Sequence, residues 1–255
     1  MAALIAGLSY PLRALRLLAR TPQLWQYVVV PILVNLLAGV VLYLGLLLPL
    51  LGQIERRINA GDGALADLFV WTVRLLLGLT LAVGVGFVLV RFGVVLGAPW
   101  YAQLSEKLEA LLTGRSYTPQ RLTLGGALGE LWRAVQFEGK KLLLAVTLWL
   151  LSLLLLLIPV AGALLYSGAG AALGATIACL DFFDGPLERR RLGFRAKLAV
   201  IRRLLPASAS FGLVAFALVS IPVVNLLAIP LCVTAGNLLV IEHEIEASNR
   251  PRAPR

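Results

Sequence analysis

The sequence carries little charge and has few residues that bind metals or form disulfides. Only 14% of its 255 residues are charged, and it contains one histidine and two cysteines. Soluble domains have about 25% charged residues, so this composition argues against a water-soluble globular fold. The histidine and cysteine counts exclude a zinc finger, a disulfide scaffold and an iron–sulfur protein.

Sequence signatures of catalysis are missing as well. The chain has no glycine-rich phosphate loop, nucleophile elbow or paired-carboxylate constellation, and His243 lacks the second histidine of a zinc-protease helix. Cys179 and Cys232 are embedded in apolar sequence, which is typical of small buried side chains. We therefore expect a protein that is not an enzyme and uses no cofactor or metal.

Long apolar runs dominate the sequence, and hydrophobic residues make up 60% of it. Residues 28–51 form a run of 24 residues, and residues 68–90 form a second run interrupted by Arg74. As a helix the first run is about 36 Å long, which exceeds the hydrocarbon thickness of about 30 Å. These runs predict an all-α integral membrane protein with two long transmembrane helices.

Two further uncharged runs, 142–180 and 204–241, contain 39 and 38 residues. Each is about twice the length of a single crossing, and Pro159 and Pro222 lie near their middles. Because proline interrupts helical hydrogen bonding, each run should fold into a helical hairpin. Arms of about 16 to 18 residues leave open whether a hairpin crosses fully or only dips into the bilayer.

Basic residues are distributed unevenly between the loops. If residues 52–67 are the only sizeable loop outside, 20 lysines and arginines lie in cytoplasmic segments and two lie outside. Positive residues favour the cytoplasmic side, so we expect a bacterial inner-membrane protein with both termini in the cytoplasm. The net charge of +10 then indicates contact with membrane lipids and not with nucleic acid.

Three segments have the pattern of amphipathic helices in the membrane interface, namely 1–20, 99–114 and 128–141. Trp132 and Phe137 are candidate interfacial anchors in the third segment. In residues 1–20 the arginines follow the apolar residues, which argues against a cleavable signal peptide.

The chain reads as a single membrane domain. No polar linker divides residues 1–250, and the short tail 251–255 is expected to be disordered.

Four short segments occur in order along nearly the whole chain. They are Pro31-Ile32-Leu33-Val34-Asn35, Ala98-Pro99-Trp100-Tyr101, Asp181-Phe182-Phe183-Asp184 and Ile221-Pro222-Val223-Val224-Asn225. Through them the sequence resembles the CysZ-type sulfate permeases, within the wider etoposide-induced-protein family of integral membrane proteins. This resemblance implies two long spanning helices, two helical hairpins, a homo-oligomer and sulfate uptake.

The sequence departs from the permeases at the start of the first long helix. There the resemblance implies two arginines, but Trp25 and Gln26 occupy the matching positions. Thr21 is a plausible N-cap, with Pro22 at the first helical position. A helix N-terminus attracts anions, so a candidate anion site is predicted here.

This candidate anion site comprises Arg20, Thr21, Gln23, Leu24, Trp25 and Gln26. We expect the N–H groups of residues 23–25 to hold the anion beside the charge of Arg20. In the alternative interpretation, Arg20 binds lipid phosphate and Trp25 belongs to the aromatic belt.

Other polar residues lie within apolar sequence. Arg74 either extends to the outer interface or lines a pathway, whereas Asn35 and Asn225 are interhelical hydrogen-bond partners or pathway residues. Asp181 and Asp184 flank a turn, where helix capping is the simpler role.

Two function classes remain. One is a transporter or channel for sulfate or a related small anion. The other is a non-transporting membrane scaffold or regulatory protein.

Overall fold

The computed structural model describes residues 2–57, 64–114 and 124–249, and within these ranges every regular element is a helix. The elements in chain order are α1 (Ala2–Arg20), the 3₁₀ turn η1 (Pro22–Leu24), α2 (Gln26–Leu42), the π-helical η2 (Tyr43–Leu47), α3 (Leu48–Arg57), α4 (Ala64–Thr113), α5 (Leu124–Leu153), the 3₁₀ turn η3 (Leu154–Leu157), α6 (Gly162–Phe182), α7 (Asp184–Arg189), α8 (Phe194–Arg203), α9 (Ala207–Val219) and α10 (Pro222–Asn249).

Several helices are long and apolar enough to cross a membrane. Four such segments are found in the described chain, namely Pro22–Gln53, Trp132–Leu157, Gly162–Phe182 and Val224–Glu244, and the bent pair α8–α9 would make a fifth. The expected all-α integral membrane fold is therefore confirmed.

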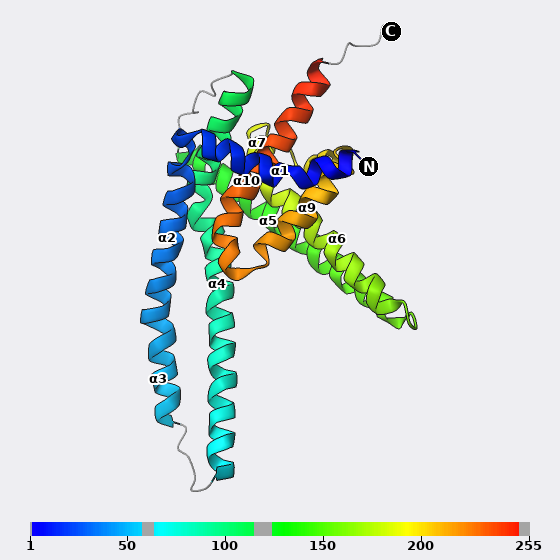
Figure 1. Ribbon diagram of the computed structural model, residues 1–255. Coiled ribbons are helices and arrows are strands. Elements are labelled where there is room, and N and C mark those ends of the chain that lie inside the picture. Colours follow the sequence, from blue (N-terminus) through cyan, green and yellow to red (C-terminus); the bar gives the residue numbers. More distant parts are fainter. Residues whose placement is uncertain (1, 58–63, 115–123, 250–255) are drawn as a thin grey trace.

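The helices radiate from a compact centre (Figure 1). The nearly continuous rod α2–η2–α3 runs beside α4, and the two extend together away from the centre. The α5–α6 hairpin projects in another direction, while α1 lies across α9 and α10. The expected spans 28–51 and 68–90 thus lie in α2–α3 and α4.

The exposed surface of α2 is apolar, as expected for a helix in contact with lipid. Leu37 and Val41 of α2 are exposed, as is Leu44 of η2, whereas the buried residues of α2 are Pro31 and Asn35. An apolar outer face costs nothing in hydrocarbon, while a polar group there lacks hydrogen-bond partners. The rod is therefore built to face lipid on one side and α4 on the other.

Both hairpins turn at the predicted prolines. After η3 the chain becomes extended at Ile158, and Val160 takes a positive φ of 66° before α6 begins. Gly162 is required there because a Cβ atom would lie 2.5 Å from the carbonyl oxygen of Leu155. In the second hairpin Pro222 is the first residue of α10, where its missing N–H is tolerated.

The arms of the two hairpins differ in length. At about 1.5 Å per residue, the 21 residues of α6 extend about 31 Å and the 13 residues of α9 about 20 Å. A hydrocarbon core of about 30 Å can be crossed by the first but not by the second. These lengths favour a deeper reach for α5–α6 than for α9–α10.

Two predicted boundaries are wrong. Residues 99–114 were expected to form a separate interfacial helix, but Pro99 lies inside the 50-residue α4. A proline removes only one helical hydrogen bond, and the buried side chains of Tyr101, Leu104 and Leu108 anchor the next turns to neighbouring helices. Residues 128–141 likewise continue into the first hairpin arm as part of α5.

The expected helix over residues 1–20 is confirmed as α1. On one face of α1, the side chains of Leu8, Leu12 and Leu15 are exposed. The opposite face buries Tyr10 and Ala14 in the core. One face is therefore free to contact lipid.

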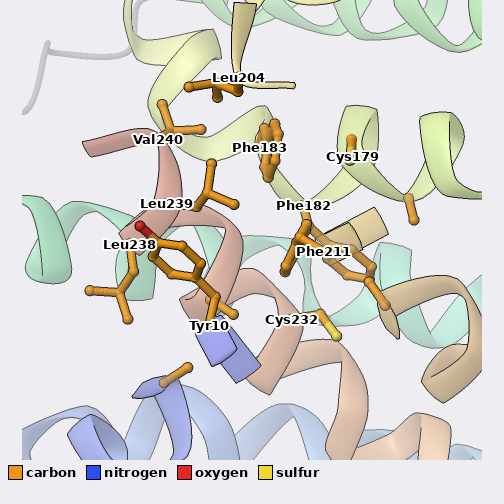
Figure 2. Close-up of a cluster of buried hydrophobic side chains, with 14 of the residues drawn as sticks. Tyr10, Cys179, Phe182, Phe183, Leu204, Phe211, Cys232, Leu238, Leu239 and Val240 are labelled. Atoms are coloured by element: carbon orange, nitrogen blue, oxygen red, sulfur yellow. The ribbon is translucent and has the colours of Figure 1, made fainter. Parts of the chain in front are cut away.

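The core forms where α6, α9 and α10 meet (Figure 2). Phe183 stacks on Phe211 with ring centroids 5.3 Å apart, and Leu239 of α10 is fully buried in the same cluster. In the segment of α10 from Val224 to Glu244, 78% of the most apolar 18-residue window is buried, against 11% to 22% in the other candidate spans. This helix is the axis around which the others are arranged.

Close approach between α6 and α9 yields a test of this packing. A Cβ atom on Gly212 would lie 2.4 Å from the carbonyl oxygen of Ala175, so Gly212→Ala should destabilise the protein by about 1–3 kcal/mol. Nothing lies near a Cβ atom on Gly170, which makes Gly170→Ala the matched control. Thermal unfolding in detergent can be followed with a thiol-reactive dye, because Cys179 and Cys232 are buried. Equal unfolding temperatures for both variants would contradict the close contact.

Candidate functional site

The predicted anion site lies at the corner between α1 and α2. Arg20 ends α1, and Pro22–Leu24 form η1 before α2 begins at Gln26. Thr21 occupies the predicted N-cap position and Pro22 is the first residue of η1, but the Thr21 side chain makes no capping hydrogen bond. The corner is a 3₁₀ turn and not the first turn of a long α-helix.

This turn uses backbone donors that the prediction assigned to an anion. The N–H of Leu24 donates to the carbonyl of Thr21 and that of Trp25 to the carbonyl of Pro22, each over 3.0 Å. A 3₁₀ turn closes its hydrogen bonds one residue earlier than an α-helix, which engages these donors. Two of the three predicted N–H groups are therefore already hydrogen-bonded.

The side chains of the corner divide into anchors and accessible groups. Leu24 is buried against Leu18 and Leu104, and the Trp25 indole, although 54% exposed, donates to the carbonyl of Leu18 over 2.8 Å. The side chains of Arg20, Gln23 and Gln26 are exposed, and Thr21 is half-buried. The structure thus brings one cation and two amides together on a fixed corner.

The other predicted polar residues lie elsewhere. Arg74 is exposed on α4, 30 residues before Leu104, which places it about 45 Å along the helix from the corner. Asn35 is buried on α2, and Asn225 is buried near the start of α10. Arg74 therefore lies far from the corner along α4.

A charged network that the sequence interpretation missed connects α4, α7 and α10. Glu109 of α4 accepts hydrogen bonds from Arg189 and from Arg190, the latter at 3.0 Å. Arg189 also donates to the hydroxyl of Ser105 over 2.9 Å, and Arg190 pairs with Glu244 over 2.5 Å. Arg189 and Arg190 therefore hold helices together.

A second network surrounds the Phe137 ring. Lys197 is almost completely buried, and its ammonium group lies 2.5 Å from Asp184 and 4.1 Å from the ring centroid. Lys141 lies on the same ring and pairs with Asp181 over 2.6 Å. Both aspartates are ion-pair partners, and the N-cap residue of α7 is Phe183, with no side-chain capping hydrogen bond, so the capping role expected for them is wrong. Phe137, expected as a membrane anchor, is likewise held within this network.

A third contact ties the N-terminal helix to the last one. Tyr10 and Arg13 both donate to Glu242, each over 2.9 Å to the same carboxylate oxygen. Burial raises the pKa of Tyr10 to about 12, so the phenol keeps its proton and acts as the donor. The contact fixes α1 across the core.

One local signal could have revealed the second network. Phe194, Lys197 and Ile201 are spaced at i, i+3 and i+7, which places them on one face of a helix. A lysine on an apolar face requires a carboxylate partner when that face is buried. No local sequence pattern indicates that Arg189 and Arg190 pair with Glu109, because Glu109 lies about 80 positions away in the sequence.

These contacts decide which cations can attract a mobile anion. In the two networks around Glu109 and Phe137, each cation named above already faces a carboxylate. The corner differs because no described carboxylate forms an ion pair with Arg20. The arrangement can attract an anion there, and no described cluster of three or more His, Cys, Asp or Glu residues could hold a metal.

Comparison with known proteins gives consistent relationships along the chain. The family described as sulfate transporter CysZ/etoposide-induced protein 2.4 matches residues 10–230. The sulfate transporter CysZ of Vibrio cholerae serotype O1 is 26% identical over 244 residues, covering 94% of each chain. The protein of the same name from Pseudomonas syringae pv. tomato is 27% identical over 237 residues, covering 92% of this chain and 91% of its own.

The first charged network provides a stability test. Glu109→Gln removes the carboxylate shared by Arg189 and Arg190, which leaves two partly buried guanidinium groups without it. We expect a loss of about 1.5–3 kcal/mol, seen as a thermal unfolding temperature several degrees lower. Glu106→Gln, one turn earlier on α4, removes the same charge where no described cation pairs with it. Equal losses for the two variants would assign the effect to net charge.

Proposed function

Since the chain belongs to the sulfate transporter CysZ/etoposide-induced protein 2.4 family, we propose that it carries sulfate or a related small anion across a membrane. The observation that carries this proposal is the family match over residues 10–230. Relatives named sulfate transporter CysZ support it, because they align over more than nine-tenths of both chains. The integral membrane fold is the architecture that such an activity requires.

The corner between α1 and α2 is the proposed place where an anion first contacts the protein. Arg20 would supply the charge, while Gln23 and Gln26 would donate neutral hydrogen bonds from their exposed amides. Because the N–H groups of Leu24 and Trp25 are engaged, recognition would depend on side chains. Trp25, tied to α1, would keep the corner rigid while these groups bind.

The membrane placement is part of the same proposal. A bacterial inner membrane with both termini in the cytoplasm puts the Glu109 network and the Phe137 network on the cytoplasmic side. This placement keeps the charged networks out of the hydrocarbon, whereas the exposed leucines of α2 face it. Homo-oligomeric assembly, expected from the resemblance, would add contacts beyond the single chain.

A specific observation favours a second candidate function. Trp25 and Gln26 stand where the resemblance implies an arginine pair, and the cations of the two charged networks are neutralised by carboxylates. A protein built in this way could instead act as a non-transporting scaffold or regulator of other membrane components. Direct measurement of flux separates the two functions.

The flux test uses purified protein reconstituted into liposomes with labelled sulfate. Transport predicts uptake above that of protein-free liposomes, and Arg20→Ala should weaken sulfate binding roughly 10- to 150-fold. Gln26→Arg should strengthen binding by adding a charged donor, as measured by isothermal titration. Arg16→Ala is the matched control, because it removes an exposed arginine one turn earlier on α1.

Two results would overturn these assignments separately. Uptake no higher than in empty liposomes, with folded and inserted protein, would favour the scaffold. Sulfate uptake with equal affinities for wild type, Arg20→Ala and Gln26→Arg would retain transport but remove the corner as its binding site.

The proposed orientation is tested by cysteine labelling. Single cysteines at positions 62, 121, 190 and 248, in a background lacking Cys179 and Cys232, would be exposed to a membrane-impermeant maleimide in intact cells. We expect labelling at position 62 alone, because the other three lie in segments assigned to the cytoplasm. Labelling at position 190 without labelling at 62 would invert the topology.

A further inference from the structure

A groove of about 400 Å³ lies between α6 and α9, where the C-terminal end of α8 also reaches it. One wall consists of small residues of α6, among them Gly168, Ala172 and Thr176. The facing wall includes Ala209 and Leu213 of α9. The volume falls within the range of about 300–1,000 Å³ typical of ligand pockets.

The polar atoms of this groove are already hydrogen-bonded within its walls. The Ser208 hydroxyl donates to the carbonyl of Ile201 over 2.7 Å, and the Cys179 thiol donates to the carbonyl of Ser208 over 3.1 Å. The hydroxyl of Thr176 donates to the carbonyl of Ala172 over 2.8 Å. The groove therefore presents a mainly apolar surface and suits a hydrocarbon chain better than a polar ligand.

The groove also has a direction. Cys179 and Ser208 lie at the end next to α8, whereas Gly168 lies 11 residues earlier on α6, about 16 Å away along the helix axis. Because α8 and α9 meet at 108°, α8 runs across the end of the groove. A long apolar ligand would thus lie along α6 and α9 with one end at α8.

The backbone of Arg202 lies at that end, directly after the lining residue Ile201. Leu205 lines the groove, is 55% exposed, and donates its N–H to the carbonyl of Arg202 over 3.2 Å. Arg202 is exposed and forms no ion pair with any described carboxylate, whereas buried Lys197 on the same helix is held by Asp184. An apolar channel with an uncompensated positive charge at one end complements an amphipathic anion.

We propose that this groove binds one acyl chain of an anionic phospholipid, with the lipid phosphate facing Arg202. The surface around the groove is apolar, since Leu164, Leu165 and Phe216 are exposed. A membrane supplies a ligand with this combination of a long hydrocarbon chain and a phosphate at the interface. The inference is independent of whether the protein transports sulfate.

The experiment uses full-length protein released from detergent in a native mass spectrometer after incubation with one lipid at a time. The probes are dioleoylphosphatidylglycerol and zwitterionic dioleoylphosphatidylcholine. Wild type should retain the anionic lipid about five-fold better, as expected for one arginine near a lipid headgroup. Arg202→Gln should abolish this preference, whereas Arg195→Gln, two turns earlier on the exposed side of α8, should keep it.

Filling the groove with a larger side chain tests whether the acyl chain of the lipid binds there. Ala172→Phe places a ring in the groove and should lower retention of both lipids, whereas Ala163→Phe alters an exposed position of α6 that does not line it. Ala209→Leu fills the same space from α9 and serves as the second variant if Ala172→Phe does not fold. Size-exclusion profiles show which variants are folded.

Three results would overturn the proposal. Wild-type lipid retention in a folded groove-filling variant would place the lipid elsewhere. Stabilisation by inorganic phosphate equal to that by phosphatidylglycerol, and lost in Arg202→Gln, would indicate a site for soluble anions. Loss of a dimer in the filled variants, with lipid retention unchanged, would assign the groove to a second copy of the chain.

Discussion

The structure depends on one constraint, which is that hydrocarbon offers a polar group no hydrogen-bond partner. Exposed hydroxyl groups on the apolar helices satisfy this locally: Thr72 and Thr80 each donate to the carbonyl four residues earlier, at 2.8 Å. In the buried interior the hydroxyl of Ser105 donates to the side-chain oxygen of Asn237 of α10. The exterior is rich in leucine and valine, and the core is the cluster of buried apolar side chains where α6, α9 and α10 meet.

Helix α10 joins the other helices into one structure. Its buried segment contacts α1, α4, α6 and α9. Glu242 forms an ion pair with Arg13 of α1, and Glu244 forms one with Arg190 at the end of α7. These ion pairs carry little weight individually at an exposed surface, but here they bridge elements that are distant in the sequence. They also hold α1 in place, and the end of α1 in turn anchors the corner through the Trp25 indole.

The same ion pairs separate structural cations from those that remain available. Arg189 and Lys197 are occupied by carboxylates and fix helices, whereas Arg20 and Arg202 stand at surfaces with no described carboxylate paired to them. Arg20 lies beside exposed amides, which suits a small hydrated anion. Arg202 lies at the end of an apolar groove, which suits the headgroup of a lipid. The surroundings of each arginine, and not its charge alone, therefore distinguish the proposed ligands.

The amino-acid sequence by itself determined the all-helical membrane fold and the two hairpins, because run length and the positions of Pro159 and Pro222 act locally. It did not determine that α4 continues through Pro99, since the contacts of Tyr101 and Leu104 with other helices decide this. It grouped residues 20–26 as a candidate site but did not determine the state of their N–H groups, because η1 and α2 differ only in which carbonyl each donor reaches. The pairs Lys141–Asp181 and Glu109–Arg189 were decided by tertiary structure alone, because they join residues 40 and 80 positions apart.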